Sequence, residues 1–316
     1  MKIVIIANFT RRLDGERENR FSYLADRLAL IGHEVELIIT DFSHGKKCKR
    51  VPPREDLYPF RITQCHEPGY KKNISIQRLY SHFVWGKNVE KYLQQFPKPD
   101  IVYCAIPSVT AARRAGKYAH KIGVKFVIDV QDLWPEAFCM AIKNKLLQKA
   151  LLPMKWYVDK AYKMADVAIG VSDTYVNRIL SVNHRLSLGI SVFLGTNGEM
   201  FDKGRQEYKI QHNDDAIWLC YVGSLSDSYD IKCVIDALNI LKKKNISIPV
   251  CFKIVGDGYL KDSFVEYAKE KSVACDFMGY KPYMEMVGIM CSCDIVINPI
   301  AKGSAASIIN KVVIMH

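Results

Sequence analysis

Short apolar runs alternate with helix-like segments along the whole chain, and this alternation limits the fold more than any other feature of the sequence. In the first half, the strand-like runs lie at 2–7, 34–39, 100–105, 125–130 and 167–170. Helix-like segments such as 18–32 and 109–122 separate them, and the second half restarts with a run at 216–222. Strands that alternate with helices build parallel sheets from βαβ units. The sequence therefore predicts an α/β protein with two successive regions of this kind.

A polar stretch separates the two regions. It begins with Gly-Thr-Asn-Gly at 195–198 and continues through 202–215, which ends in Gln-His-Asn-Asp-Asp. A chain of 316 residues is long enough for two domains with cores of their own. We therefore place the boundary near 196–214 and predict the domains 1–196 and 197–316.

Three apolar runs in the second region end in glycine, at Gly223, Gly256 and Gly279. Ligands in open α/β sheets bind at the carboxyl ends of the strands. Glycine at such a point lets backbone amides approach a phosphate or a base, because no Cβ stands in the way. Each glycine taken alone is an ordinary turn residue, whereas several strand-end glycines in series favour a nucleotide-binding site.

The formal net charge of +12 suits several classes of partner and does not choose among them. Nucleic acid, anionic lipid and phosphorylated substrates all attract a basic surface, and many soluble proteins are simply basic. Neither zinc-finger spacing nor an aromatic RNA-binding strand supports nucleic acid. A nicotinamide-dependent oxidoreductase would need Gly-x-Gly-x-x-Gly after the first strand, and the sequence Ala-Asn-Phe-Thr at 7–10 does not provide it.

The cysteines and the apolar runs both favour a cytoplasmic protein. None of the ten cysteines forms a Cys-x-x-Cys pair, and several lie inside predicted strands, as small core residues of a reduced protein do. No apolar run approaches the roughly 20 residues that a membrane-spanning helix needs. The run at 2–7 is too short for a signal peptide and is predicted to be a buried strand.

The stretch 129–136, Asp-Val-Gln-Asp-Leu-Trp-Pro-Glu, carries most of the chemistry of the first region. Carboxylates and an amide at the end of a strand can orient the hydroxyls of a substrate or take part in proton transfer. We favour Asp129 or Glu136 for the site, whereas Asp132 is equally well explained as the N-cap of the next helix. The first and fifth strands of a doubly wound sheet open onto one groove, which Asn8, Asp129 and Asp132 should therefore line. Asp129→Ala should then reduce turnover far more than stability.

A lysine-rich segment at 142–163 surrounds one tryptophan. Its residues of interest are Lys143, Lys149, Trp156, Lys160 and Lys163. On helical spacing, Trp156, Lys160 and Lys163 share a face that could rest on anionic lipid and bring an enzyme to a lipid-linked acceptor. A solvated lysine face with one partly packed tryptophan explains the same pattern, and the sequence leaves both interpretations open.

In this order and spacing, the motifs resemble the family-4 glycosyltransferases. The N-terminal blocks at 8–10, 19–21, 32–35 and 41–46, together with the stretch 129–136, are similar to the branch that builds bacterial capsule and O-antigen polysaccharides. The resemblance extends over essentially the whole chain. It implies the GT-B fold, with two facing Rossmann-like domains, and transfer of a sugar from a nucleoside-diphosphate sugar to a polysaccharide or lipid-linked acceptor with retention of anomeric configuration.

The resemblance also implies where the substrates bind. The donor would lie on the second domain, the acceptor would approach from the first, and neither a metal nor another cofactor would be used. Charge on the leaving diphosphate would be met by backbone amides, helix N-termini and basic side chains. The implied donor-binding residues are Gly223, Ser224, Gly256, Tyr280, Ser304, Ser307 and Lys311. The implied catalytic residues are Asp129, Asp132 and Glu136, with Asn8 and Gln131 on the acceptor side. Gln131 can hydrogen-bond, but unlike the histidine of many relatives it cannot act as a base.

The sequence departs from the family near its end. Family members usually carry an acidic residue three positions after the lysine that corresponds to Lys311, whereas this chain has Ile314 there and ends at His316. We therefore interpret the second domain as incomplete, and expect a poorly active enzyme or an inactive remnant that binds donor weakly. Titration with UDP- and GDP-sugars separates an enzyme from a remnant. The expected location is the cytoplasm, with peripheral contact to the inner face of the cell membrane.

Overall fold

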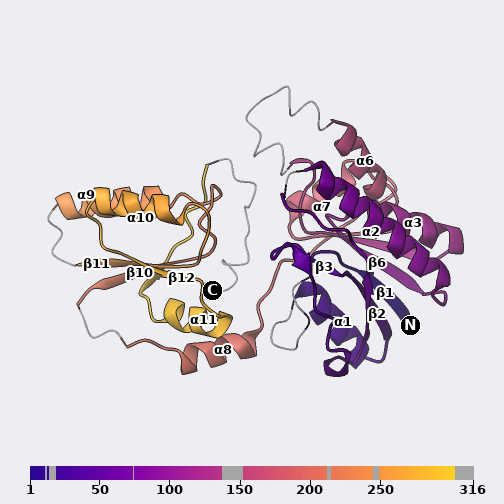
Figure 1. Ribbon diagram of the computed structural model, residues 1–316, viewed down its shortest axis with the longest axis horizontal. Coiled ribbons are helices and arrows are strands. Elements are labelled where there is room, and N and C mark those ends of the chain that lie inside the picture. Colours follow the sequence, from indigo (N-terminus) through magenta and orange to yellow (C-terminus); the bar gives the residue numbers. More distant parts are fainter. Residues whose placement is uncertain are drawn as a thin grey trace. The chain divides into compact units, whose positions relative to one another are not determined.

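The computed structural model describes residues 1–10, 13, 19–73, 75–136, 152–211, 215–244 and 249–302. The chain forms two compact units, Met1–Phe193 and Leu194–His316. In Figure 1 each unit is a sheet with helices on both of its faces. The α/β class and the parallel sheets predicted from the sequence are confirmed.

Seven parallel strands form the described sheet of the first unit, in the order β5-β2-β1-β6-β7-β8-β9. They are β1 (Lys2–Ile6), β2 (Glu34–Thr40), β5 (Arg61–Cys65), β6 (Ile101–Ile106), β7 (Lys125–Val130), β8 (Val167–Gly170) and β9 (Ile190–Ser191). A small antiparallel pair, β3 (Phe42–Ser43) and β4 (Cys48–Lys49), follows β2. The central strands read as continuous apolar runs because helices cover both faces of the sheet.

Helices cover both faces of this sheet, and alternate side chains of a strand pack against the helices on opposite faces. The helices are α1 (Arg20–Leu30), α2 (Ile76–Gln95), α3 (Val109–Ile122), α6 (Leu152–Tyr162), α7 (Asp173–Leu180) and the 3-10 helix η1 (Glu55–Leu57). On β1, Ile3 and Ile5 pack in a cluster with α1, whereas Val4 and Ile6 pack in a cluster with α2, α3, α6 and α7. This alternation follows from the two-residue period of a strand.

The second unit repeats the plan on a smaller scale. Its described sheet has the order β12-β11-β10-β13, and all its pairs are parallel. The strands are β10 (Ile217–Val222), β11 (Val250–Val255), β12 (Cys275–Gly279) and β13 (Ile295–Val296). Figure 1 shows α9 (Ile231–Lys243) and α10 (Lys261–Glu270) on one face and α8 (Gly198–Glu207) and α11 (Tyr283–Cys291) on the other.

The order of strands determines where a ligand can enter each sheet. β1 lies between β2 and β6, and β10 lies between β11 and β13. The connections that leave two such neighbouring strands run in opposite directions, which opens a crevice at the carboxyl ends of the strands. In the first unit, this point lies at the ends of β1 and β6.

The predicted role of the cysteines holds for part of the set. Cys65, Cys104 and Cys220 are buried, as small core residues should be, whereas Cys48 and Cys233 are exposed. Among the helices that the structure describes, none is both long and apolar enough to cross a membrane.

Candidate functional site

A cavity of about 140 Å³ opens at the carboxyl ends of β1, β6 and β7 in the first unit. Its lining consists of Asn8, Phe9, Asn19, Arg20, Phe21, Ala105, Ile106, Pro107 and Gln131. It therefore lies at the point where the strand order reverses, which is where an open α/β sheet binds its ligand. Asn8 and Gln131, the two residues predicted for the acceptor side, both line it.

Asp129 lies behind the cavity as a fully buried carboxylate at the end of β7. Arg20 approaches it side-on, with Nε 2.8 Å from Oδ2 and Nη2 3.3 Å from Oδ1. The hydroxyl of Tyr103 donates to Oδ2 at 2.5 Å, and the amide of Gln131 donates to Oδ1 at 2.6 Å. An ionised carboxylate offers about four acceptor positions, so these donors use the whole carboxylate. Asp129 thus positions Arg20 and Gln131, which line the cavity.

The first turn of α1 determines where Arg20 lies. Asn19 is the N-cap, and its side-chain oxygen accepts from the backbone N–H groups of Phe21 and Ser22 at 3.1 and 3.2 Å. The Ser22 hydroxyl accepts from the Asn19 N–H at 3.0 Å, which completes a reciprocal cap. Arg20 also donates to the carbonyl of Val192 at 3.0 Å. The guanidinium is therefore fixed by Asp129 and by the Val192 carbonyl. It lines the cavity with its charge already balanced by Asp129.

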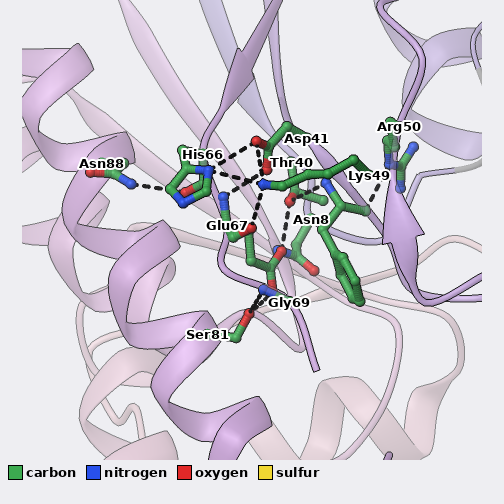
Figure 2. A network of polar contacts seen from close by, with 11 residues as sticks. Asn8, Thr40, Asp41, Lys49, Arg50, His66, Glu67, Gly69, Ser81 and Asn88 are labelled. Carbon is green, nitrogen blue, oxygen red and sulfur yellow. Dashed lines mark hydrogen bonds and ion pairs between the residues drawn. The ribbon is translucent and has the colours of Figure 1, made fainter. Parts of the chain in front are cut away.

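Asn8 is oriented by a second buried acid, Glu67, as Figure 2 shows. Glu67 follows β5 and is almost completely buried. Its Oε2 accepts from the amide of Asn8 at 2.9 Å and from the hydroxyl of Thr40 at 2.6 Å. Its Oε1 accepts from the hydroxyl of Ser81, on α2, at 2.8 Å. One N–H of the Asn8 amide is thus engaged with Glu67, which fixes the orientation of this side chain at the cavity.

The loop that carries Glu67 is fixed in turn by Asp41 (Figure 2). Asp41 accepts from the backbone N–H of Glu67 at 2.7 Å and from the ammonium of Lys49 at 2.7 Å, and it lies 2.9 Å from Nδ1 of His66. Partial burial would raise the pKa of Asp41, but these three contacts outweigh it and hold the pKa below its ordinary value. Asp41 is therefore ionised at neutral pH and anchors the loop.

Glu67→Gln should lower the free energy of unfolding by about 1–3 kcal/mol. The carboxylate accepts from Asn8, Thr40 and Ser81, whereas the NH₂ group of glutamine cannot accept and would face one of these donors. Urea unfolding monitored by circular dichroism measures the change. Glu55→Gln, the same substitution at an exposed position in η1, is the control and should leave stability unchanged. Equal stability of both variants and the wild type would show that the carboxylate of Glu67 does not anchor its neighbours.

None of the three predicted catalytic residues lines the cavity: Asp129 lies behind it, and Asp132 and Glu136 have other partners. Asp132 accepts from the indole N–H of Trp134 at 3.2 Å. Burial raises the pKa of Asp132 above its ordinary value, although Trp134, the Leu133 N–H and Arg78 each lower it. Glu136 accepts from Nε of Arg178 at 2.6 Å, and the same guanidinium binds Asp159 at 2.5 Å. These contacts give Glu136 a structural partner. The helix that Asp132 was predicted to cap falls outside the described residues.

A buried histidine, His82 on α2, lies among aromatic rings next to this region. Its ring stacks on Trp134 with centroids 5.7 Å apart, and it lies 5.5 Å from Phe9, which lines the cavity. The guanidinium carbon of Arg78 lies 4.6 Å from the Trp134 ring centroid. Burial lowers the pKa of His82 from 6.5 to about 3, and the charges of Arg78 and His44 add to the effect. His82 is therefore neutral in the folded protein at any pH above this value.

The low pKa of His82 predicts how stability depends on pH. Between pH 6.5 and about 3 the unfolded chain binds a proton that the folded protein does not, so the contribution of His82 is complete above pH 6.5 and is lost as the pH falls. The slope should reach about 1.4 kcal/mol per pH unit. Urea unfolding between pH 7 and pH 4 should therefore show a steeper decline for the wild type than for His82→Gln. The same substitution at exposed His184 should leave the slope unchanged, and a similar slope in all three proteins would contradict the assignment.

The strand-end glycines of the second unit lie in a row across its sheet. The N–H of Gly223 donates to the carbonyl of Val255 at 2.9 Å, and the N–H of Gly256 donates to the carbonyl of Gly279 at 2.8 Å. A Cβ on Gly256 would lie 1.8 Å from the carbonyl oxygen of Gly223. The absence of a side chain at Gly256 thus serves the close packing of two loops, a role that the sequence prediction did not include.

The remaining residues predicted to bind the donor are placed only in part. The carbonyl of Ser224 accepts from the hydroxyl of Tyr221 at 2.7 Å, and Tyr280, directly after Gly279, is exposed. Ser304, Ser307 and Lys311 lie outside the described residues, as do Lys143 and Lys149. Trp156 is exposed, and the ammonium of Lys160 lies 3.3 Å from its ring centroid.

Sequence reasoning missed Arg20, Tyr103 and Glu67 as parts of the site. Arg20 belongs to a block quoted for the resemblance, and a cation at the first position of a helix that follows a strand-end loop was an available signal. Tyr103 lies inside an apolar strand and gave no signal. Glu67 follows a strand, Arg-Ile-Thr-Gln-Cys, whose polar composition concealed it.

Comparisons with known proteins identify the fold and the family. The model of Glycosyltransferase Family 4 matches residues 18–186, which is more than half of the chain. No curated protein sequence matches this chain. The solved structure of Anabaena HepE in complex with UDP aligns at a TM-score of 0.58 and 16% identity, over 94% of this chain and 73% of that one.

Two further structures have the same fold. WaaG, a glycosyltransferase involved in lipopolysaccharide biosynthesis, aligns at a TM-score of 0.61 and 15% identity, over 96% of this chain and 76% of that one. A trehalose-6-phosphate protein from E. coli, bound to UDP-2-fluoro glucose, aligns at a TM-score of 0.65 and 9% identity, over 96% of this chain and 79% of that one. These likenesses show the GT-B fold. With the family match, they lead to one conclusion: the chain belongs to glycosyltransferase family 4, the retaining enzymes that transfer a sugar from a nucleoside-diphosphate sugar.

Proposed function

We propose that this enzyme transfers its sugar to a hydroxyl group of a polysaccharide or lipid-linked acceptor, and that the acceptor binds in the cavity of the first unit. The lining carries the proposal: Asn8, Asn19 and Gln131 supply amides, and Phe9 and Phe21 supply apolar rings. Amides can donate to and accept from hydroxyls, which suits a sugar. The charge of Arg20 is balanced by Asp129, so the cavity favours an uncharged ring.

The donor would bind on the second unit. The carboxyl ends of β10, β11 and β12, at Gly223, Gly256 and Gly279, are where an open α/β sheet binds a nucleotide. The N–H groups of Gly223 and Gly256 are already bonded to backbone carbonyls, so neighbouring backbone amides, helix N-termini and basic side chains would meet the charge of the leaving diphosphate. Ser224 and Tyr280 follow directly and are proposed to contact the nucleotide, with Ser304, Ser307 and Lys311 as further donor residues. Because solved structures with this fold hold UDP or a UDP-sugar, UDP-sugars are the first donors to test.

The wider setting is proposed from the same residues. The N-terminal blocks that resemble the capsule and O-antigen branch favour a role in bacterial surface polysaccharide synthesis on the cytoplasmic side of the membrane. Contact of the face formed by Trp156, Lys160 and Lys163 with a membrane remains a hypothesis. The contact of the Lys160 ammonium with the Trp156 ring favours the alternative, a solvated lysine face.

Donor titration and acceptor kinetics test the proposal together. Calorimetry should detect a UDP- or GDP-sugar that binds the wild type. Gln131→Ala removes one hydrogen-bonding amide from the cavity and should raise the KM for acceptor about fivefold to tenfold, with the Kd for donor unchanged. Gln94→Ala, at an exposed position of α2, should change neither. An increase in the donor Kd of Gln131→Ala, with the acceptor KM unchanged, would assign the cavity to the donor.

A further inference from the structure

The first two turns of α2 present their apolar side to solvent. Ile76, Leu79, Tyr80 and Phe83 have exposed fractions of 85%, 53%, 60% and 43%. Their spacing of three and four residues places them on one face of the helix. Figure 1 shows α2 beside α3 in the first unit. Over its later turns the helix is ordinary, because Trp85, Val89 and Leu93 are buried.

The opposite side of the same two turns is polar and buried. Ser81 donates to Glu67 at 2.8 Å, and Arg78 donates to the carbonyl of Asn73 at 2.8 Å and stacks on Trp134. His82 stacks on the same tryptophan. These contacts explain why the inner side is polar. They do not explain why four large apolar side chains lie outside, and an exposed apolar group of this size marks an interaction surface.

Lysines lie on either side of the apolar residues along the chain. Lys71 and Lys72 precede the helix, and Lys87 and Lys91 follow the apolar turns on the same face; all four are exposed. The one acidic residue of α2, Glu90, forms an ion pair with Arg114. We call the four apolar residues and these four lysines the α2 outer face. It combines apolar side chains with a net positive charge.

We propose that the α2 outer face docks the protein on an anionic lipid bilayer. Apolar side chains of a surface helix enter the boundary between headgroups and acyl chains, and the flanking lysines meet anionic headgroups. Tyr80 suits this depth, because tyrosine concentrates at membrane interfaces. A second copy of the chain is a poor occupant, since two such faces would bring lysines together. The charge of the face thus selects the bilayer.

Docking on this face would also bring the cavity close to the membrane. The turn that exposes Tyr80 also carries Ser81, which reaches Asn8 of the cavity through Glu67. The sugar of a lipid-linked acceptor could then enter the cavity while its lipid stays in the bilayer. This last step rests on the proposed function, whereas lipid binding itself does not.

Vesicle co-sedimentation tests the docking surface. The wild type should bind vesicles of phosphatidylcholine with phosphatidylglycerol and should not bind phosphatidylcholine alone. Leu79→Ser/Tyr80→Ser/Phe83→Ser should lower the partition coefficient at least about tenfold. Lys71→Ser/Lys72→Ser should lower it about fivefold per lysine at low salt, and less at high salt. Because these positions are exposed, thermal unfolding should match that of the wild type.

A matched variant on α6 separates the two membrane hypotheses. Trp156→Ser/Lys160→Ser should sediment with vesicles as the wild type does. If that variant loses binding and the α2 variants keep it, the proposal is wrong. It is equally wrong if the wild type does not bind anionic vesicles, or if sedimentation velocity shows that the α2 substitutions abolish a dimer instead. Because no sugar is used, a failure of docking is distinguishable from a failure of the proposed transfer.

Discussion

Asp129→Ala should lower the free energy of unfolding by about 3–5 kcal/mol, because it leaves the guanidinium of Arg20 partly buried without its counter-charge. Tyr103 and Gln131 lose an acceptor in the same change. The sequence alone predicted a loss of turnover with little loss of stability. The four contacts now predict that both fall together, which urea unfolding and a turnover assay on the same protein measure.

Two variants show whether the buried pair causes the loss. Asp56→Ala breaks a comparable aspartate–arginine pair, Asp56 with Arg54, at 2.7 Å, but on the surface, and should leave stability unchanged. Arg20→Met/Asp129→Leu removes both charges and should be more stable than Asp129→Ala. If the double variant is the less stable one, the unpaired guanidinium is not the cause.

Gly256→Ala should cost the second unit about 3 kcal/mol or more in its free energy of unfolding. The φ angle of Gly256 is 147°, which side chains rarely adopt, and the added Cβ would meet the backbone of Gly223. Relief of that contact requires a loop to move. Trp218, in β10, is one of four tryptophans in the chain. Urea unfolding followed by 19F NMR of protein labelled with 5-fluorotryptophan resolves its signal from the other three and reports on this unit.

Gly198→Ala is the control for this prediction. Gly198 is the first residue of α8, and a Cβ there would meet no atom within 4 Å. The substitution should be neutral or slightly stabilising, because alanine restricts the unfolded chain. If Gly256→Ala unfolds at the same urea concentration as Gly198→Ala, the loops after β10 and β11 are not packed as described.

Elements with a regular pattern could be predicted from the sequence, and those with mixed faces could not. The helix expected at 109–122 is α3, Val109–Ile122, whose alanines face the core and whose end is marked by Gly123. The helix α2 gave no such pattern, because its first two turns are polar inside and apolar outside. The edge strand β5 was hidden for a similar reason, since Arg61, Thr63 and Gln64 interrupt its apolar residues.

The candidate site divides along the same line. The sequence predicts Asn8, Asp129 and Asp132 in one groove, because the carboxyl ends of parallel strands meet at one edge. Asn8 lines the described cavity, together with Gln131, whereas Asp129 and Asp132 do not. The sequence could not show that Asp132 and Glu136 lie outside the cavity. Their hydrogen bonds with Trp134 and Arg178 form only in the folded structure. Charge pairs between distant segments leave no periodic signal in a sequence.

The position of β1 inside its sheet has a consequence for synthesis on the ribosome. β1 is the first strand to emerge, yet one of its edges stays open until the chain has been made as far as Ile101, which lies opposite Ile3. The same delay recurs in the second unit, where one edge of β10 stays open until β13 has been made, because Leu219 lies opposite Ile295. An open apolar strand edge can pair with other chains. The nascent protein is therefore most prone to aggregation while β1 and then β10 await their second neighbours, and slow translation of the intervening segments would prolong that exposure.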